Sequence, residues 1–276
     1  MSQSDESTMS QGAQTSKATL SILTVSLNCL EHFEITATSL PDVLPDWVEW
    51  IVVDGKSTDG TAESVGKDKR VTRWISEKDA GVYDAYNKAL SLSASDYVMY
   101  LNCGDALCEH ALDFIFTAIH QKNTHSLQRS VHCFPIRMLA SDGYIWKPLP
   151  TDLGKAMTVP TPGVIFPRES LLAIDGFDDH LRVAADYEVL LRLSQLGHPF
   201  SVHNGVVVNY IGGGISSDHQ HLAFFEECVV QLRHHTVTGN DCLLRAARRA
   251  VQELAPEDIP YKRWRCAIRI GKKLLY

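Results

Sequence analysis

Several features are scarce in this sequence of 276 residues, and each absence excludes a class of protein. The seven cysteines contain no CxxC pair, and an odd number cannot all close into intramolecular disulfides, so we expect reduced thiols. No stretch offers the ~20 apolar residues that a membrane-spanning helix needs. The net charge of −7 and the pI near 5.9 exclude the basic footprint of a nucleic-acid-binding domain.

What is present describes a globular protein. Apolar residues make up 45% and charged residues 21% of the chain, which allows a core that needs no disulfides. Residues 1–17, rich in Ser, Gln and Gly, lack the apolar core of a signal peptide, so we expect a disordered leader. We expect one main domain over 18–216, a helical extension over 217–276, and a cytoplasmic location.

Apolar runs and helical patterns alternate through the first part of the chain. The runs predict strands, and the spacing between them predicts helices. The expected strands are 19–27, 47–54, 71–76 and 97–102, and the main helices are 30–40, 80–93 and 109–121. This alternation predicts parallel βαβ units, and hence an α/β fold with a Rossmann-like, mostly parallel sheet flanked by helices.

The pattern changes after residue 125. A small antiparallel section is expected around the turn at Ser141-Asp142-Gly143. Its strands are 130–139 and 144–146; further on we expect helices at 168–174 and 184–196, a strand at 199–210, and C-terminal helices at 218–237 and 240–254.

Two of the predicted strands are followed by a carboxylate. Asp54 ends an apolar strand just before a helix cap at 58–61, and Asp105 follows the strand at 97–102. The carboxyl ends of parallel strands meet at one edge of an open α/β sheet, where nucleotides bind. Two acids at this edge therefore suit the binding of a nucleotide and its metal ion.

Five spaced motifs occur in a recognisable order. They are SILTVSLN at 21–28, VVDGKSTDGT at 52–61, DAGVYDAYNK at 79–88, LNCGD at 101–105, and GFD at 176–178 with ADYE at 185–188. The chain resembles the family-two glycosyltransferases, which have the GT-A fold and make bacterial surface polysaccharides. The resemblance covers roughly residues 18 to 216.

The resemblance implies transfer of a sugar from a nucleoside-diphosphate donor to an acceptor hydroxyl, with inversion at the anomeric carbon. Asp54 can accept hydrogen bonds from the base or ribose, and Ser26 can add a hydroxyl contact. The resemblance also places the helix face that begins at Asp79 beside the diphosphate. The predicted donor-binding residues are Ser26, Asp54, Asp79, Asn87, Lys88, Asn102 and Gly104.

A diphosphate leaving group needs a divalent cation to neutralise the charge that develops on it. Asp105 is the predicted ligand of Mg²⁺ or Mn²⁺, with phosphate oxygens and waters completing the shell. The family's metal motif usually carries two or three acids, whereas Asn102, Gly104 and Asp105 stand here. A single carboxylate leaves two alternatives open: a weak metal site completed by the nucleotide, or no dependence on metal.

Asp186 opens an apolar helix and is the predicted general base that deprotonates the acceptor hydroxyl. The alternative is that Asp186 only caps the helix. Glu188 is interpreted as a supporting acid or as a solvated helix residue.

The remaining motifs are less specific. Gly212-Gly213-Gly214 is either a phosphate-facing loop or a plain turn, since no GxxxxGK[ST] or GxGxxG pattern surrounds it. The histidines near residues 219–235 are expected to be solvated and not to bind zinc. Residues 261–276 form a basic amphipathic segment that suits an anionic membrane surface and a lipid-linked acceptor, or else a solvated terminal helix.

Two other functions compete with this interpretation. A sugar nucleotidyltransferase would carry a Gly-rich, basic loop after the first strand, and residues 28–31 offer none. A catalytically degenerate protein that binds nucleotide sugars without turnover would fit a metal motif with only one carboxylate.

Overall fold

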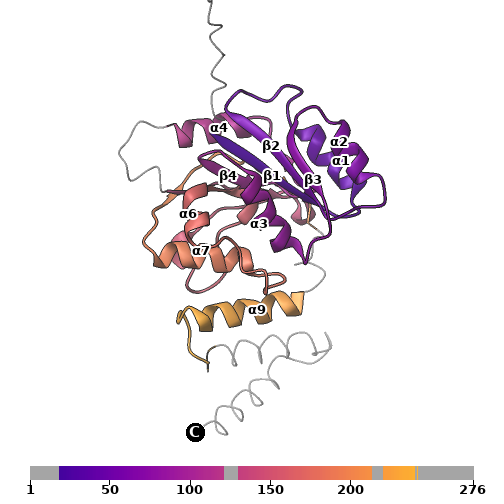
Figure 1. Cartoon of the computed structure of the whole chain (residues 1–276). Coiled ribbons are helices and arrows are strands. Elements are labelled where there is room, and N and C mark those ends of the chain that lie inside the picture. Colours follow the sequence, from indigo (N-terminus) through magenta and orange to yellow (C-terminus); the bar gives the residue numbers. More distant parts are fainter. Residues whose placement is uncertain (1–18, 121–129, 213–219, 240, 242–276) are drawn as a thin grey trace, which may run out of the picture.

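The computed structural model describes residues 19–120, 130–212, 220–239 and 241 (Figure 1). Some predictions concern residues outside these ranges, namely the leader, the basic C-terminal segment and nearly all of the last predicted helix. Of the glycine-rich loop, only Gly212 is described, with a φ of 86°.

Seven strands form the large sheet, in the order β10-β6-β9-β4-β1-β2-β3. Strands β4, β1, β2 and β3 are mutually parallel, β9 is antiparallel to both of its neighbours, and β10 is parallel to β6. The bounds are β1 Leu20–Ser26, β2 Val48–Asp54, β3 Val71–Ser76, β4 Tyr97–Tyr100, β6 Val131–Cys133, β9 Val164–Pro167 and β10 Phe200–Val202. The mostly parallel sheet predicted from the sequence is confirmed.

Separate cores lie on the two faces of this sheet, because side chains alternate along each strand. In β2, Ile51 and Val53 belong to one core, whereas Trp50 and Val52 belong to the other. The first core includes residues of α3 and α7, and the second includes residues of α1 and α4, so helices cover both faces (Figure 1). The helices are α1 Leu30–Ser39, α2 Thr61–Lys67, α3 Val82–Leu92, α4 Ala111–Ile119, α6 Arg168–Ala173, α7 Ala185–Gln195 and α9 Gln220–Arg233.

A smaller sheet has the order β5-β11-β7-β8. Strands β7 and β8 are antiparallel and are joined through the predicted turn, where Asp142 and Gly143 have φ values of 51° and 74°. The bounds are β5 Ala106–Leu107, β7 Ile136–Met138, β8 Tyr144–Trp146 and β11 Val208–Tyr210, and short 3₁₀ helices lie at Leu139–Ser141, Pro150–Asp152 and Thr161–Gly163.

The segment 199–210, predicted as one strand, is divided in the structure. Its first part, β10, pairs with β6 in the large sheet, whereas its last part, β11, pairs with β5 and β7 in the small one. Between them Gly205 approaches the ring of Phe114 so closely that a Cβ at Gly205 would lie 2.4 Å from it. The break is therefore set by pairing partners and close packing, which local propensity does not encode.

Helix α9 lies against α7, at one end of the part of the chain that the structure describes (Figure 1). Its Val230 is fully buried and belongs to the core on the α3 and α7 side of the large sheet. The predicted domain boundary at 216 places α9 in an extension, yet α9 shares the core of the main domain. In the ranges that the structure describes, no helix has the length and apolar character needed to cross a membrane.

Candidate functional site

One cavity of about 810 Å³ opens at the carboxyl ends of β1 and β4. It is bounded by α3, the small sheet, the segment that contains Thr161, the beginning of α7, and one face of α9. Its volume falls in the range of roughly 300–1,000 Å³ that is typical of small-molecule sites. Of the residues predicted to act in the reaction, the cavity is lined by Ser26, Asp79, Asn102, Asp105 and Asp186.

Asp105 lies at the wall of this cavity and is only 5% exposed. Burial raises the pKa of its carboxyl to about 7, and a hydrogen bond with the backbone of Ile211 opposes that rise. Its backbone is anchored, because the Thr36 hydroxyl donates to the Asp105 carbonyl at 2.8 Å. A buried carboxylate whose charge has little compensation fits a hard divalent cation well.

The two other residues of the predicted metal motif have different places. Asn102 lines the cavity, and its side-chain oxygen accepts a hydrogen bond of 2.8 Å from the Tyr86 hydroxyl. Gly104 does not line the cavity: its N–H donates to the His32 carbonyl and the Thr36 hydroxyl, and its φ is +96°. Gly104 therefore shapes the turn that presents Asp105, instead of contacting a donor as predicted.

Asp54 differs from the expectation that it contacts the nucleotide. The residue is fully buried and is not among those that line the cavity. Its carboxylate accepts hydrogen bonds from the hydroxyls of Ser26 at 3.0 Å, Ser57 at 2.5 Å and Ser76 at 2.6 Å, and from the Ser57 N–H at 2.9 Å. Burial acts to raise the pKa of Asp54, but these hydrogen bonds outweigh it and hold the pKa below its ordinary value. Ser26 thus stands between Asp54 and the cavity.

Only one of the three residues predicted from the 79–88 motif lies at the cavity. Asp79 lines it, and burial raises the pKa of its carboxyl. Asn87 is instead bonded to the backbone of Phe177, donating at 2.8 Å and accepting at 2.9 Å. The Lys88 ammonium lies 3.0 Å from Glu77 and 3.2 Å from Asp84, and the structure places neither Asn87 nor Lys88 at the cavity wall.

Asp186 is the second residue of α7, and its carboxylate lies at the cavity wall. One oxygen accepts from the Thr161 hydroxyl at 3.0 Å, and the other accepts from the Tyr187 N–H at 2.8 Å. Burial raises the pKa of Asp186 above its ordinary value despite these hydrogen bonds. The N-cap of α7 is Ala184, so the alternative of Asp186 as the N-cap does not describe the structure.

Glu188 is a buried ion-pair partner, neither solvated nor at the cavity. The residue is 3% exposed, and its carboxylate accepts from Arg192 at 2.8 Å and pairs with the His234 ring at 3.0 Å. It therefore joins α7 to the end of α9. This interaction also accounts for His234, which was expected to be solvated.

Several wall residues were not predicted. Thr161 orients Asp186, and the apolar part of the wall is formed by Met138, Trp146, Met157, Tyr210 and Phe224. Tyr83, which belongs to the motif at 79–88, also lines the cavity; it is 6% exposed and donates to the Val183 carbonyl at 2.6 Å. These residues come from segments far apart in the chain, so no local pattern marks them.

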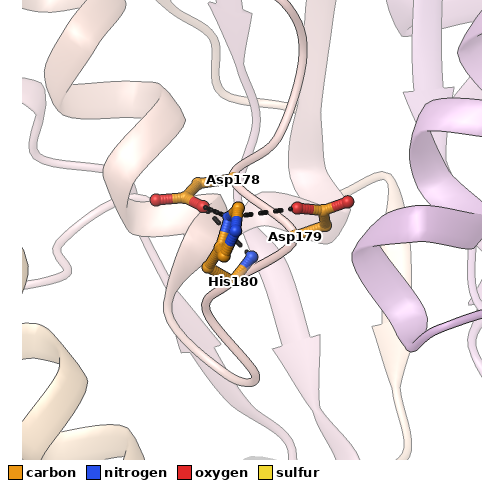
Figure 2. A group of neighbouring side chains, drawn as sticks. All are labelled: Asp178, Asp179 and His180. Carbon is orange, nitrogen blue, oxygen red and sulfur yellow. Dashed lines mark hydrogen bonds and ion pairs between the residues drawn. The ribbon is translucent and has the colours of Figure 1, made fainter.

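Within the described ranges, one group of three side chains could bring metal ligands together away from this cavity. Figure 2 shows it: Asp178, Asp179 and His180, with the His180 ring 3.1 Å and 3.3 Å from the two carboxylates. The other oxygen of Asp178 pairs with Arg233 at 2.5 Å, and His180 is 91% exposed at its side chain. Because Arg233 already compensates Asp178, this group fits a surface ion-pair cluster better than a site for the reaction.

Comparison with known proteins adds independent findings. Residues 21–133 match the family model described as Glycosyl transferase family 2. The uncharacterized glycosyltransferase Rv1514c of Mycobacterium tuberculosis is 26% identical over 217 residues, which cover 76% of this chain and 82% of that protein. The hyaluronan synthase of Pasteurella multocida is 26% identical over 235 residues, which cover 82% of this chain but 23% of the synthase.

A solved structure shows the same fold. The mannosyltransferase PcManGT from Pyrobaculum calidifontis, in complex with GDP-Man and Mn²⁺, aligns with a TM-score of 0.59 at 17% identity. The alignment covers 95% of this chain and 82% of that one. At this identity the likeness establishes the architecture.

Proposed function

We propose that this chain, a family-two glycosyltransferase with the GT-A fold, transfers a sugar from a nucleoside-diphosphate sugar to an acceptor hydroxyl, with inversion at the anomeric carbon. The observation that carries the proposal is that Asp105 and Asp186, from distant parts of the chain, line one cavity. One carboxylate suits a cation and the other suits the incoming hydroxyl, which are the two charges that the reaction must manage.

The donor occupies the polar part of the cavity in this proposal. Ser26 and Asn102, at the ends of neighbouring strands, offer hydrogen-bonding groups to the nucleotide, while Asp105 would hold Mg²⁺ or Mn²⁺. When bound, such a cation neutralises negative charge on the leaving diphosphate. The Mn²⁺ and GDP-Man in the PcManGT structure support this arrangement.

The acceptor occupies the apolar part of the cavity. Trp146, Met157 and Phe224 form much of this wall, and such surfaces suit the apolar faces of a sugar ring. The hyaluronan synthase among the relatives supports a glycan acceptor, with a lipid-linked glycan as the alternative.

Asp186 acts as the general base in this mechanism. Its oxygens are oriented by Thr161 and by the Tyr187 N–H, so the carboxylate is held at the wall in a defined direction. A raised pKa brings a base closer to the operating pH, where proton transfer from a hydroxyl is most effective. The acceptor oxygen loses its proton to Asp186 as it attacks the anomeric carbon, and the diphosphate leaves from the opposite face.

The proposal is tested by measuring sugar transfer from a panel of nucleotide sugars, with and without Mn²⁺. We expect Asp186→Asn to keep donor binding and to lose about 10²-fold to 10⁴-fold in transfer, the usual contribution of a general base. Asp179→Asn is the matched control, since Asp179 belongs to the surface cluster and should leave transfer unchanged. Equal transfer by wild type and Asp186→Asn would refute the assignment of the base.

The metal motif has a single carboxylate, Asp105, and this favours one second candidate function, a protein that binds nucleotide sugars without turnover. Calorimetry with UDP and GDP distinguishes the two, because an active transferase should bind one nucleotide tightly and only with the cation. Binding that is independent of the cation, together with no transfer for any donor, would favour the degenerate protein.

We further propose that the enzyme works at the inner face of the cytoplasmic membrane, through the basic segment 261–276. Sedimentation with vesicles of phosphatidylserine or phosphatidylcholine tests this location. The full chain should bind the anionic phosphatidylserine vesicles and not the phosphatidylcholine vesicles. Removal of 261–276 should abolish that binding. Equal binding of the shortened chain would contradict the proposal.

A further inference from the structure

Glu226 of α9 holds three consecutive backbone amides of another segment. Its carboxylate accepts from the N–H of Arg182 at 2.9 and 3.1 Å, of Val183 at 2.8 Å and of Ala184 at 3.0 Å. The residue is only 7% exposed. Hydrogen bonds to a buried charged acceptor are among the stronger ones in proteins, so this contact fixes the path of the backbone at 182–184.

These amides stand immediately before α7. The first N–H groups of a helix have no partner inside the helix, and a side chain at the N-cap usually satisfies one of them. Here the N-cap is Ala184, which has no polar side chain, and Glu226 accepts from the N–H of Ala184 itself and from the two N–H groups before it. A carboxylate at this end also interacts favourably with the helix dipole.

The same segment forms part of the cavity wall. Arg182, Val183 and Ala184 all line the cavity, and Asp186 follows two residues later. From the other side, the Tyr83 hydroxyl donates to the Val183 carbonyl at 2.6 Å. The backbone that leads to Asp186 is therefore held between α3 and α9, and Glu226 provides the charged half of that clamp.

We propose that Glu226 is a positioning residue: it fixes the start of α7 so that Asp186 meets the acceptor hydroxyl in the right geometry. This inference rests on the proposed function, because it takes Asp186 to be the general base. It assigns a catalytic contribution to α9, which lies beyond the residues that match the family model.

A simpler explanation is that Glu226 only attaches α9 to the domain. Other contacts do this at the far end of the same helix, namely the Arg233–Asp178 ion pair and the pairing of His234 with Glu188. Arg233→Ala therefore offers a matched control, since it weakens the attachment of α9 without touching 182–184. If Glu226 only attaches α9, kcat should fall only as far as stability falls, and equally in both variants. If Glu226 positions Asp186, kcat should fall in Glu226→Ala and not in Arg233→Ala.

The experiment compares wild type, Glu226→Ala, Glu226→Gln and Arg233→Ala in the full chain. It measures kcat, donor KM, calorimetric binding of UDP and GDP with Mn²⁺, and Tm, with kinetics recorded well below the lowest Tm. We expect Glu226→Ala to lower kcat by about 10²-fold with little change in donor binding, as small displacements of catalytic groups do. The kcat of Glu226→Gln should lie between those of wild type and Glu226→Ala. The amide oxygen of the glutamine can still accept a hydrogen bond, whereas its NH₂ group would face backbone N–H donors. Arg233→Ala should lower Tm but keep kcat.

Each other outcome decides the matter. A wild type that transfers no sugar refutes the proposed function itself. A transferring wild type whose kcat is unaffected in Glu226→Ala, or falls equally in Glu226→Ala and Arg233→Ala, refutes the positioning role. If Glu226→Ala does not fold, Glu226→Gln decides: a kcat equal to that of wild type refutes the inference.

Discussion

The ends of β2 and β4 share a sequence pattern, an apolar strand followed by an aspartate, yet the two carboxylates have different surroundings. Asp54, at the end of β2, is fully buried and accepts hydrogen bonds from three serine side chains. Asp105, after β4, lies at the cavity wall, where burial raises its pKa to about 7. The first charge is compensated within the protein, whereas the second needs a cation or a proton.

This difference shows what makes a strand-end acid available to a ligand. A buried charge without partners is unfavourable, and a site that keeps one pairs it with something from outside. Asp54 instead organises its neighbours. Its carboxylate accepts hydrogen bonds from the hydroxyl of Ser26, a residue that lines the cavity, and from the backbone N–H of Ser57 in the turn after β2. Its effect on a nucleotide is therefore expected to pass through Ser26.

The largest expected effect comes from Asp105→Asn. Cation-dependent binding of UDP or GDP should weaken by about 10²-fold or more, because a Lewis-acid cation contributes several kcal/mol. Calorimetry with and without Mn²⁺ measures this, and the free energy of unfolding should not fall. Asp54→Asn in the same assay should keep its dependence on the cation. Cation-dependent binding at the wild-type level in Asp105→Asn would contradict the conclusion that Asp105, unlike Asp54, holds the cation.

Asp54→Asn should act mainly on stability. We expect the free energy of unfolding to fall by roughly 3 kcal/mol, since hydrogen bonds to a charged group contribute about 1.5–3 kcal/mol each and the amide cannot accept them all. Urea unfolding measures the change, with the exposed Asp179→Asn as the control, which should lie close to wild type. A midpoint equal to that of wild type would mean that the serine contacts contribute nothing.

The smallest effect is on the pH dependence of stability. The pKa of Asp54 is lower in the folded protein than in the unfolded chain, so its contribution is present above the unfolded value of 3.8 and is lost as the pH falls through the folded value. Stability measured by urea unfolding should therefore decrease below about pH 4, more steeply in wild type than in Asp54→Asn. Parallel curves for the two proteins would contradict this account.

Much of the site could be predicted because its residues stand at the ends of elements. Asp105 follows β4 and Asp186 stands in the first turn of α7, and the topology of an α/β sheet brings such ends to one edge. Asn87 shows the limit of this reasoning. It lies on the expected face of α3, but the backbone of Phe177, from a distant segment, occupies its amide group.

Glu226 could not be predicted at all. Its position in α9 resembles that of any acid in a surface helix, and its partners at 182–184 lie in another part of the chain. The division of 199–210 into β10 and β11 has the same origin, because each half takes a different pairing partner.

The amino-acid sequence by itself determined the alternation of strands and helices, the mostly parallel sheet, and which acids stand at the ends of elements. These follow from periodicity and from turn chemistry, which act over a few neighbouring residues. Only the tertiary structure decided which acids are compensated by partners and which face a cavity. Hydrogen-bond partners and burial come from segments far apart in the chain, and they alone set the charge and accessibility of each carboxylate.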